Sequence, residues 1–354
     1  MIKFFRHIRY NLMSKNQMGK YFKYAIGEIL LVVIGILIAL QINNWNERNK
    51  NQIYVETLLS TIESNLVNDI QQANARMHYY FEKDSLANLV LTDALSKNDY
   101  LNNPQLGFLV YQSREPIYLS ESIQTLLDKE AELSSQYILI LNMAKEMEER
   151  VSVFDETYKH LNDVNIPENF NFLADHIPTY IKTDPITTAN KIDLYLKSES
   201  YKAKVSHNWS ISNRLARNIA HLRFLSTKML IELKSRKERM SSSEIKELLE
   251  SLHFLPFYEV GCQEIATSDE RNREEPYFVI NLTETTVQLR NAFIDKPENY
   301  VLPQELAPFE IIKLPSTYRG IDGEYGLVVI QSAPNKNECM KKFVSRKNGY
   351  LIIE

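Results

Sequence analysis

Hydrophobic residues concentrate in one uninterrupted run near the start of the chain. Residues 24–42 have the sequence YAIGEILLVVIGILIALQI, nineteen residues with one formal charge, Glu28. A helix of this length extends about 28 Å, which matches the hydrocarbon core of a bilayer. The pattern predicts a transmembrane helix over 24–42, with the lipid bilayer as its surroundings. No second apolar run of this length follows, so we expect a single-pass protein.

Beyond this run, apolar residues recur at steps of three and four, which is typical of amphipathic helices. No Gly or Pro lies between Gly35 and Pro104, so we expect the membrane helix to continue as a stalk with coiled-coil character. The absence of glycine between Gly107 and Gly261 favours long antiparallel helices in a bundle. The three stripes are Val55, Leu59, Ile62, Leu66, Ile70, Ala73 and Met77; Ile140, Ala144, Met147, Val151, Phe154, Tyr158 and Leu161; and Val205, Trp209, Ser212, Ala216, Ile219, Leu222, Met229 and Leu233.

Charged residues predict which faces of these helices point outward, and prolines and charged segments predict where the helices end. The third stripe is flanked by basic residues that we expect to face mostly outward: Arg214, Arg217, Arg223, Lys228 and Lys234. The proline-containing segment 165–185 and the charged segment 234–239 are expected to be connectors. Ser241 and Glu244 have the spacing of a capping box, which predicts a short helix that ends before Pro256 and forms a hinge.

After residue 256, alternating apolar and polar positions replace the helical period. A strand is predicted over 277–282, and a turn at 283–285 would return the chain through Val287, Leu289 and Phe293 as a hairpin. Several short strands in about 100 residues predict a small β-sandwich; the others are expected at 309–314, 325–331, 342–345 and 350–353.

The predicted fold class is therefore mainly α with a C-terminal β domain. A transmembrane helix continues into an antiparallel helical bundle, and a small β-sandwich follows. The expected domains are a basic cytoplasmic segment at 1–23, the transmembrane helix at 24–42, an extracytoplasmic helical bundle at 43–255 and a β-sandwich-like domain at 256–354.

Charge predicts the orientation of the membrane helix. The net charge of −4 divides into +6 over the first 24 residues and −10 over the rest. Basic residues beside a membrane span stay on the cytoplasmic side, so we expect an inner-membrane protein with a cytoplasmic N-terminus and a periplasmic bulk. The run is long for a cleaved signal peptide, and Ala39-Leu40-Gln41 is a poor cleavage site, so an uncleaved signal anchor is favoured over cleavage.

Residues at the two ends of the apolar run are expected to fix its depth. Lys20 and Lys23 are the expected anchors on the inner side, and Trp45 is the expected anchor in the outer headgroup belt. Gly35 and Ala39 have the small-xxx-small spacing that lets two membrane helices pack closely. The same spacing also arises by chance, so a homodimer through the membrane helix and stalk is one of two open alternatives.

Two parts of the sequence resemble known families. Segment 25–50, AIGEILLVVIGILIALQINNWNERNK, is similar to the N-terminal part of a family of uncharacterised membrane proteins common in Bacteroidota, a domain of unknown function. This resemblance implies a helical extracytoplasmic region up to about residue 240 and no known activity. The patterns N-L-T-x-x-x-V-x-L at 281–289 and T-Y-x-G at 317–320 resemble the β domain of von Hippel–Lindau-type proteins. The Gly-His-Trp that follows the tyrosine in those proteins is absent, so their ligand recognition does not carry over.

The cysteines allow two interpretations. An extracytoplasmic compartment permits a disulfide between Cys262 and Cys339. Two separate buried thiols are the alternative, because spacing in sequence does not show proximity in space.

No motif in the sequence indicates catalysis, and we single out no catalytic, cofactor-binding or metal-binding residue. The seven histidines are scattered, and neither H-x-x-x-H, C-x-x-C, G-x-S-x-G nor a phosphate-binding glycine loop occurs. The acidic clusters around residues 130 and 148 are typical of a solvated helix face. We expect no cofactor and no nucleic-acid partner.

Three functions remain open at this stage. The first is a membrane-anchored binding or sensing module with an unknown envelope protein as partner. The second is a structural scaffold in which copies of the chain pair. The third is an envelope enzyme whose site is formed by residues distant in sequence.

Overall fold

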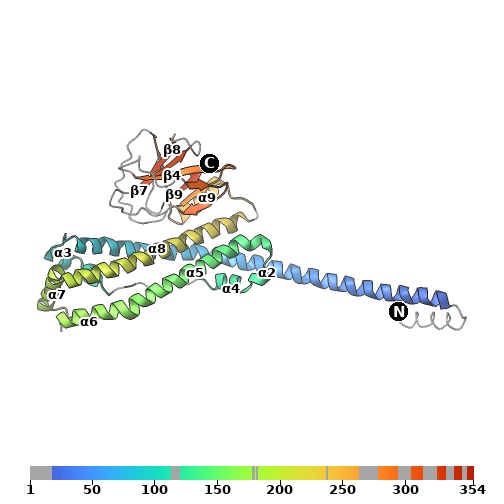
Figure 1. The fold of residues 1–354 in the computed structure, drawn as a ribbon, viewed down its shortest axis with the longest axis horizontal. Helices are drawn as coiled ribbons and strands as arrows, with labels where there is room; N and C mark the ends of the chain where they lie inside the picture. The colour runs from blue at the N-terminus through green and yellow to red at the C-terminus, as the bar shows by residue number, and fades with distance from the viewer. Residues whose placement is uncertain are drawn as a thin grey trace. The chain divides into compact units, whose positions relative to one another are not determined.

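A computed structural model describes residues 18–111, 113, 120–177, 180, 182–236, 238–262, 278–293, 304–313, 325–331, 339–344 and 349–354 (Figure 1). The chain divides into two compact units, Met1–Ser60 and Thr61–Glu354. Several expectations concern residues outside the described parts: most of the basic segment 1–23, the side chain of Lys20 and the 317–320 motif.

The first unit consists, over its described part, of the N-terminal portion of helix α2 (Met18–Leu91). The large apolar side chains between Ile26 and Ile42 are 44% to 64% exposed. This segment reaches a mean hydropathy of 2.3, and α2 is the one helix in the described part of the chain that is long and apolar enough to cross a membrane. The sequence pattern and the structure therefore agree on an apolar helix that the described part of the chain leaves uncovered.

The second unit begins with a helical bundle. Its helices are the part of α2 from Thr61 onward and α3 (Lys97–Asn102), α4 (Glu121–Asp128), α5 (Ile138–His160), α6 (Ile166–His176), α7 (Pro185–Lys197), α8 (Glu199–Ser235) and α9 (Ser242–Ser251). Short helical turns lie between them: η1 (Pro104–Phe108), η2 (Glu130–Glu132), η3 (Ser135–Tyr137) and the π-turn η4 (Leu161–Asn165). Helix α5 packs along α8, and one core cluster joins side chains of α2, α5 and α8, among them Met77, Phe154 and Ile219.

The predicted stripes form the core of the bundle. Every member of the first stripe is buried, and so are the members of the other two except Val151, Tyr158 and Trp209, which are partly buried. Burial of a side chain of this size stabilises a fold by about 1.5 to 3 kcal/mol. The periodicity therefore predicted correctly which face of each long helix is covered.

The basic residues that flank the third stripe do face mostly outward, with one exception, and one expected connector is wrong. Arg223 does not face outward, because it is only 3% exposed and its Nη1 donates to Asn74 Oδ1 on α2 at 2.9 Å. Its guanidinium also lies over the ring of Phe254, 5.0 Å from the centroid. A basic residue beside an apolar stripe can thus be buried when it makes a hydrogen bond to a polar side chain and a cation–π contact with an aromatic ring.

The segment 165–185 is also not a connector throughout. The chain passes from α5 through η4 directly into α6, where the N–H of Ile166 donates to the carbonyl of Leu161. Pro167 lies in the first turn of α6, directly after the π-turn η4, whose irregular hydrogen bonding accommodates a residue without an N–H. The proline therefore begins a helix here, and the break comes only after His176.

The C-terminal strands form two sheets. The strands are β1 (Leu255–Pro256), β2 (Tyr258–Val260), β3 (Phe278–Asn281), β4 (Val287–Phe293), β5 (Gln304–Leu306), β6 (Ile311–Lys313), β7 (Tyr325–Gln331), β8 (Cys339–Val344) and β9 (Gly349–Ile353). One sheet has the order β1-β9-β3-β6, with β9 parallel to both neighbours, and the other has the order β2-β8-β7-β4-β5. Val279 and Leu351 from the first sheet pack with Leu289 and Phe343 from the second. The predicted fold of a helical bundle followed by a small β-sandwich is confirmed.

The predicted hairpin at 283–285 is wrong, because β3 and β4 belong to different sheets. The fully buried side chain of Asn281 organises this crossing. Its Nδ2 donates to the carbonyls of Thr285, Leu306 and Ala307 at 2.9 to 3.1 Å. Its Oδ1 accepts from the N–H and hydroxyl of Thr283 at 3.0 and 2.8 Å. The asparagine turns the chain out of one sheet and into the other.

Replacing Asn281 by alanine would leave these buried backbone groups without their partner. We expect Asn281→Ala to destabilise the sandwich by about 2 kcal/mol, seen as roughly 30-fold faster hydrogen exchange of the β3 and β9 amides. Asn142→Ala, at an exposed position of α5, is the matched control and should leave these rates unchanged. Equal exchange in the two variants would contradict the role assigned to Asn281.

Candidate functional site

The hinge between the bundle and the sandwich contains the candidate site. Helix α8 ends at Ser235 and α9 begins at Ser242. The predicted capping box is confirmed: the N–H of Ser241 donates to Glu244 Oε2 at 2.7 Å, and Ser241 Oγ accepts from the N–H of Glu244 at 3.4 Å. Hydrogen bonds from the hydroxyl and N–H of Ser241 lower the pKa of Glu244. The box fixes where α9 begins and therefore how it faces the end of α8.

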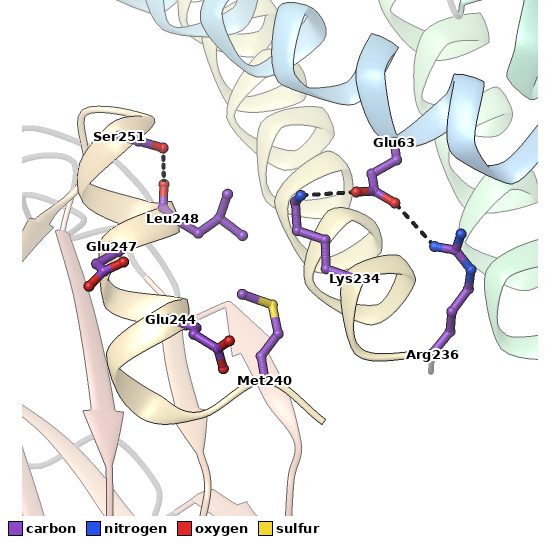
Figure 2. A pocket seen from close by; sticks show the side chains of 8 residues that line it. All are labelled: Glu63, Lys234, Arg236, Met240, Glu244, Glu247, Leu248 and Ser251. Carbon is purple, nitrogen blue, oxygen red and sulfur yellow. Dashed lines mark hydrogen bonds and ion pairs between the residues drawn. The ribbon is translucent and has the colours of Figure 1, made fainter. Parts of the chain in front are cut away.

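A groove lies between the end of α8 and α9 (Figure 2). It holds about 630 Å³ of open space, which is within the range of natural ligand sites. Its lining residues are Glu63 of α2, Lys234 of α8, Arg236, Met240, and Glu244, Glu247, Leu248 and Ser251 on α9. Two helices of the bundle thus form one wall, and the helix that leads into the sandwich forms the other.

The wall on the bundle side has one carboxylate and two cations. Lys234 Nζ lies 2.9 Å from Glu63 Oε1, and Arg236 Nη1 lies 3.1 Å from Glu63 Oε2. Burial alone would raise the pKa of Glu63, but the hydrogen bonds and positive charges of Lys234 and Arg236 lower it overall. Arg236 Nη1 also donates to the carbonyl of Leu233 at 2.6 Å, at the end of α8. This wall carries a net positive charge and is held in place by its own ion pairs.

The opposite wall is apolar near the hinge and acidic at its rim. Figure 2 shows the side chains of Met240 and Leu248 extending into the space between the walls, and both are partly buried. Glu244 and Glu247 are exposed on the same helix. The groove thus offers hydrogen-bond donors on one side, carboxylates on the other and an apolar strip between them. This combination suits an amphipathic segment that carries charges of both signs.

A second polar cluster lies where the sandwich meets the bundle. His221 Nε2 is 2.8 Å from Glu146 Oε1 on α5, and His221 Nδ1 is 2.6 Å from Lys313 Nζ on β6. Burial lowers the pKa of Lys313 to about 8, and the nearby Arg150 adds to this effect. Among the described residues, no group of three His, Cys, Asp or Glu side chains is placed to hold a metal ion.

The residues that the sequence predicts to act in the membrane or in helix pairing do not line this groove. Ala39 and Lys23 are exposed on α2, Trp45 is 69% exposed, and a Cβ added at Gly35 would meet no atom within 4 Å. Their roles in the membrane and in helix pairing stay predictions.

The two cysteines are joined by a disulfide in the structure. The Cα atoms of Cys262 and Cys339 are 6.0 Å apart. The bond ties the chain just after β2 to the first residue of β8, which is the strand that pairs with β2.

Sequence analysis did not predict the groove. The charged segment 234–239 was noted only as a connector, and Glu63 lies 171 residues before Lys234 in the chain. The capping box was the one local signal at this place. Likewise, no pattern pointed to the pairing of His221 with Lys313, since the two residues are 92 positions apart.

Comparison with known proteins gives one match. Residues 28–174 match the model of a family of unknown function, DUF6090, which covers less than half of the chain. The match begins within the apolar part of α2 and ends in α6. No curated protein and no solved structure matches the chain. The matched part is thus similar to an uncharacterised domain, and the resemblance of the C-terminal strands to von Hippel–Lindau-type domains stays a prediction.

The ion pairs of Glu63 predict a pH-dependent contribution to stability. Because the pKa of this carboxyl is lowered in the folded state, the contribution is present above its ordinary value of 4.5 and is lost as the pH falls through the folded value. We expect Glu63→Gln to destabilise the bundle by about 1 kcal/mol near pH 7 and by progressively less as the pH falls through the lowered pKa of Glu63. Denaturant unfolding followed by far-UV circular dichroism measures this difference. Glu247→Gln, on the other wall, is the control, and a Glu63→Gln deficit that does not change with pH would refute the ion-pair explanation.

Proposed function

We propose that this protein is a membrane-anchored interaction module that binds an extracytoplasmic protein segment in the groove between α8 and α9. The observation that carries the proposal is the composition of the groove, with Lys234 and Arg236 on one wall, Glu244 and Glu247 on the other, and apolar side chains between them. Interfaces of this kind place an apolar core inside a charged rim, and their complementary charges select and orient the partner.

The apolar segment of α2 supports the membrane anchor. The apolar side chains of residues 26–42 are about half exposed, and contact with lipid suits them better than contact with water. The excess of basic residues before this segment supports a cytoplasmic N-terminus in the inner membrane, with the groove on the periplasmic side. The disulfide between Cys262 and Cys339 fits the same assignment, because disulfides persist in oxidising compartments.

The partner that we propose is a protein segment rather than a small molecule. The groove is open to solvent, with Lys234 and Arg236 among the residues on one wall and Glu244 and Glu247 on the other, and Figure 2 shows Leu248 pointing into the space between the walls. A small ligand would be poorly enclosed in such a site, whereas an amphipathic helix or extended segment can place apolar side chains on Met240 and Leu248. Its acidic side chains would then meet Lys234 and Arg236, and its basic side chains would meet Glu244 and Glu247.

A structural scaffold formed by paired copies is the second candidate. It is favoured by the open space at Gly35, where the surface of α2 has room for the backbone of another helix. This candidate predicts that pairing depends on residues 35 and 39, whereas the interaction module predicts that partner contact depends on the groove.

Site-directed photo-crosslinking in native membranes tests the interaction module. A photoreactive amino acid at Leu248 is expected to capture a defined protein, and the same probe at the exposed residue Glu149 on α5 is not. Reversing the basic wall with Lys234→Glu and Arg236→Glu should reduce capture about 10-fold or more, because two favourable charges become repulsive. Lys246→Glu, an exposed charge reversal on α9, serves as the matched control. Capture that is equal from both probes, or unchanged by the double reversal, would contradict the proposal.

A further inference from the structure

His221 lies where α5, α8 and the first sheet of the sandwich meet. Its ring belongs to α8 and is bonded at both nitrogens to other elements, to Glu146 of α5 and to Lys313 of β6. The side chain of His221 is only 18% exposed, so water replaces these partners poorly. One side chain therefore links the helical bundle to a strand of the sandwich.

The hydrogen bonds define the protonation state of this ring. A lysine ammonium can only donate, so Nδ1 of His221 must be the acceptor from Lys313. With Nδ1 unprotonated, Nε2 carries the hydrogen and donates it to the carboxylate of Glu146. The contact as it stands therefore requires a neutral imidazole in the Nε2–H tautomer.

Protonation of the ring would turn the contact with Lys313 from attractive to repulsive. Both ring nitrogens would then be donors, and two cations would face each other across 2.6 Å. A third cation is close by, because Arg150 of α5 adds a positive potential and its buried Nε has no hydrogen-bond partner among the described residues. Within the described part of the chain, Glu146 is the carboxylate that raises the pKa of both His221 and Lys313, and its single charge can offset only part of this positive charge.

The surroundings of the ring resist protonation at neutral pH. Burial lowers the pKa of His221; the hydrogen bond that the ring donates to Glu146 opposes this effect, and the charges of Lys313 and Arg150 strengthen it. Because the pKa is lower in the docked state, the docking contact is stable above the ordinary value of 6.5 and weakens as the pH falls through the docked value.

Other contacts also join the first sheet of the sandwich to α8. Lys228 Nζ donates to the carbonyl of Ile311 at 3.2 Å, and the rings of Phe224 and Phe278 are 6.3 Å apart. The sandwich is also connected to α9, since Tyr350 Oη on β9 donates to Glu250 Oε1 at 3.5 Å. A sandwich that moves away from α8 would therefore pull on α9 against the hydrogen bond from Asn74 Nδ2 of α2 to the carbonyl of Leu252, and would change the width of the groove.

We propose that His221 is a proton-sensitive latch, which holds the β-sandwich against the helical bundle while its ring is neutral and releases it when the ring is protonated. The latch itself is independent of the groove. Its consequence for partner binding rests on the proposed function. Only a partner bound in the groove would be affected when the wall formed by α9 moves away from the wall formed by α8.

Distance measurements on the full chain in lipid nanodiscs test the latch. Spin labels carried by unnatural amino acids at the exposed positions Glu149 on α5 and Lys341 on β8 leave the disulfide intact. Double electron–electron resonance should give one short distance near pH 8, and a longer population that rises about 10-fold in relative amount near pH 5. His221→Gln should stay in the short state at both pH values, because an amide can accept from Lys313 and donate to Glu146 without gaining a charge.

Two further variants make the test decisive. Lys313→Met removes one of the two cations that repel the protonated ring, so it should weaken the response to pH, while burial and Arg150 still oppose protonation. His207→Gln, an exposed histidine on the same helix, should respond as the unmodified chain does. A distance distribution that does not change with pH, or a response that persists in His221→Gln, would overturn the latch. If the latch is overturned in this way but the probe at Leu248 still captures a protein near pH 8, the proposed function is retained. A failure of the latch can therefore be told apart from a failure of the proposed function.

Discussion

The apolar surface of α2 between residues 26 and 42 is the constraint on which the placement of the whole chain depends. A dozen large apolar side chains are about half exposed there, and removing them from water is worth on the order of 20 kcal/mol. This exceeds the net stability of an ordinary domain. Within the described residues the protein buries none of this segment, so a bilayer is the environment that stabilises it best. In the proposed topology, the residues after this segment lie on the side of the membrane opposite to the basic residues.

Apolar burial and buried polar contacts have different roles in the second unit. Stripes of apolar residues hold the long helices together, but apolar contacts alone do not specify how the sandwich meets them. That specification comes from polar groups. Arg223 connects Asn74 of α2 to the ring of Phe254, and Asn74 Nδ2 donates to the carbonyl of Leu252 at 3.2 Å. A buried polar group without its partner is costly, so these contacts favour one arrangement over others that bury equal apolar area.

Local patterns predicted the local structure well. The three stripes, the capping box at Ser241 and the strands of the sandwich follow from periodicity and turn chemistry, which depend on residues a few positions apart. Errors arose where distant residues decide. Arg223 looked like a surface residue because its partners Asn74 and Phe254 lie on other elements. The hairpin at 283–285 was wrong because Asn281 is bonded to the carbonyls of Leu306 and Ala307, about 25 positions further on.

The candidate site was hidden from the sequence for the same reason. The groove requires Glu63 beside Lys234, and the latch requires His221 beside Lys313, and neither pairing leaves a spacing pattern. The sequence did predict the hinge at which the groove lies, because a capping box and the charged residues before it are local features. Sequence reasoning thus predicted the place where two parts of the chain join and did not predict the chemistry that their junction creates.

The side of the membrane on which the second unit lies is the central claim, since the groove, the disulfide and the latch all take their proposed meaning from it. Fusion of alkaline phosphatase and, separately, of green fluorescent protein to the C-terminus of the full chain measures this side directly in living cells. We predict an active phosphatase and a dark fluorescent protein. The phosphatase matures only outside the cytoplasm, whereas green fluorescent protein exported through the general secretion pathway does not become fluorescent. A bright fluorescent protein together with an inactive phosphatase would contradict it.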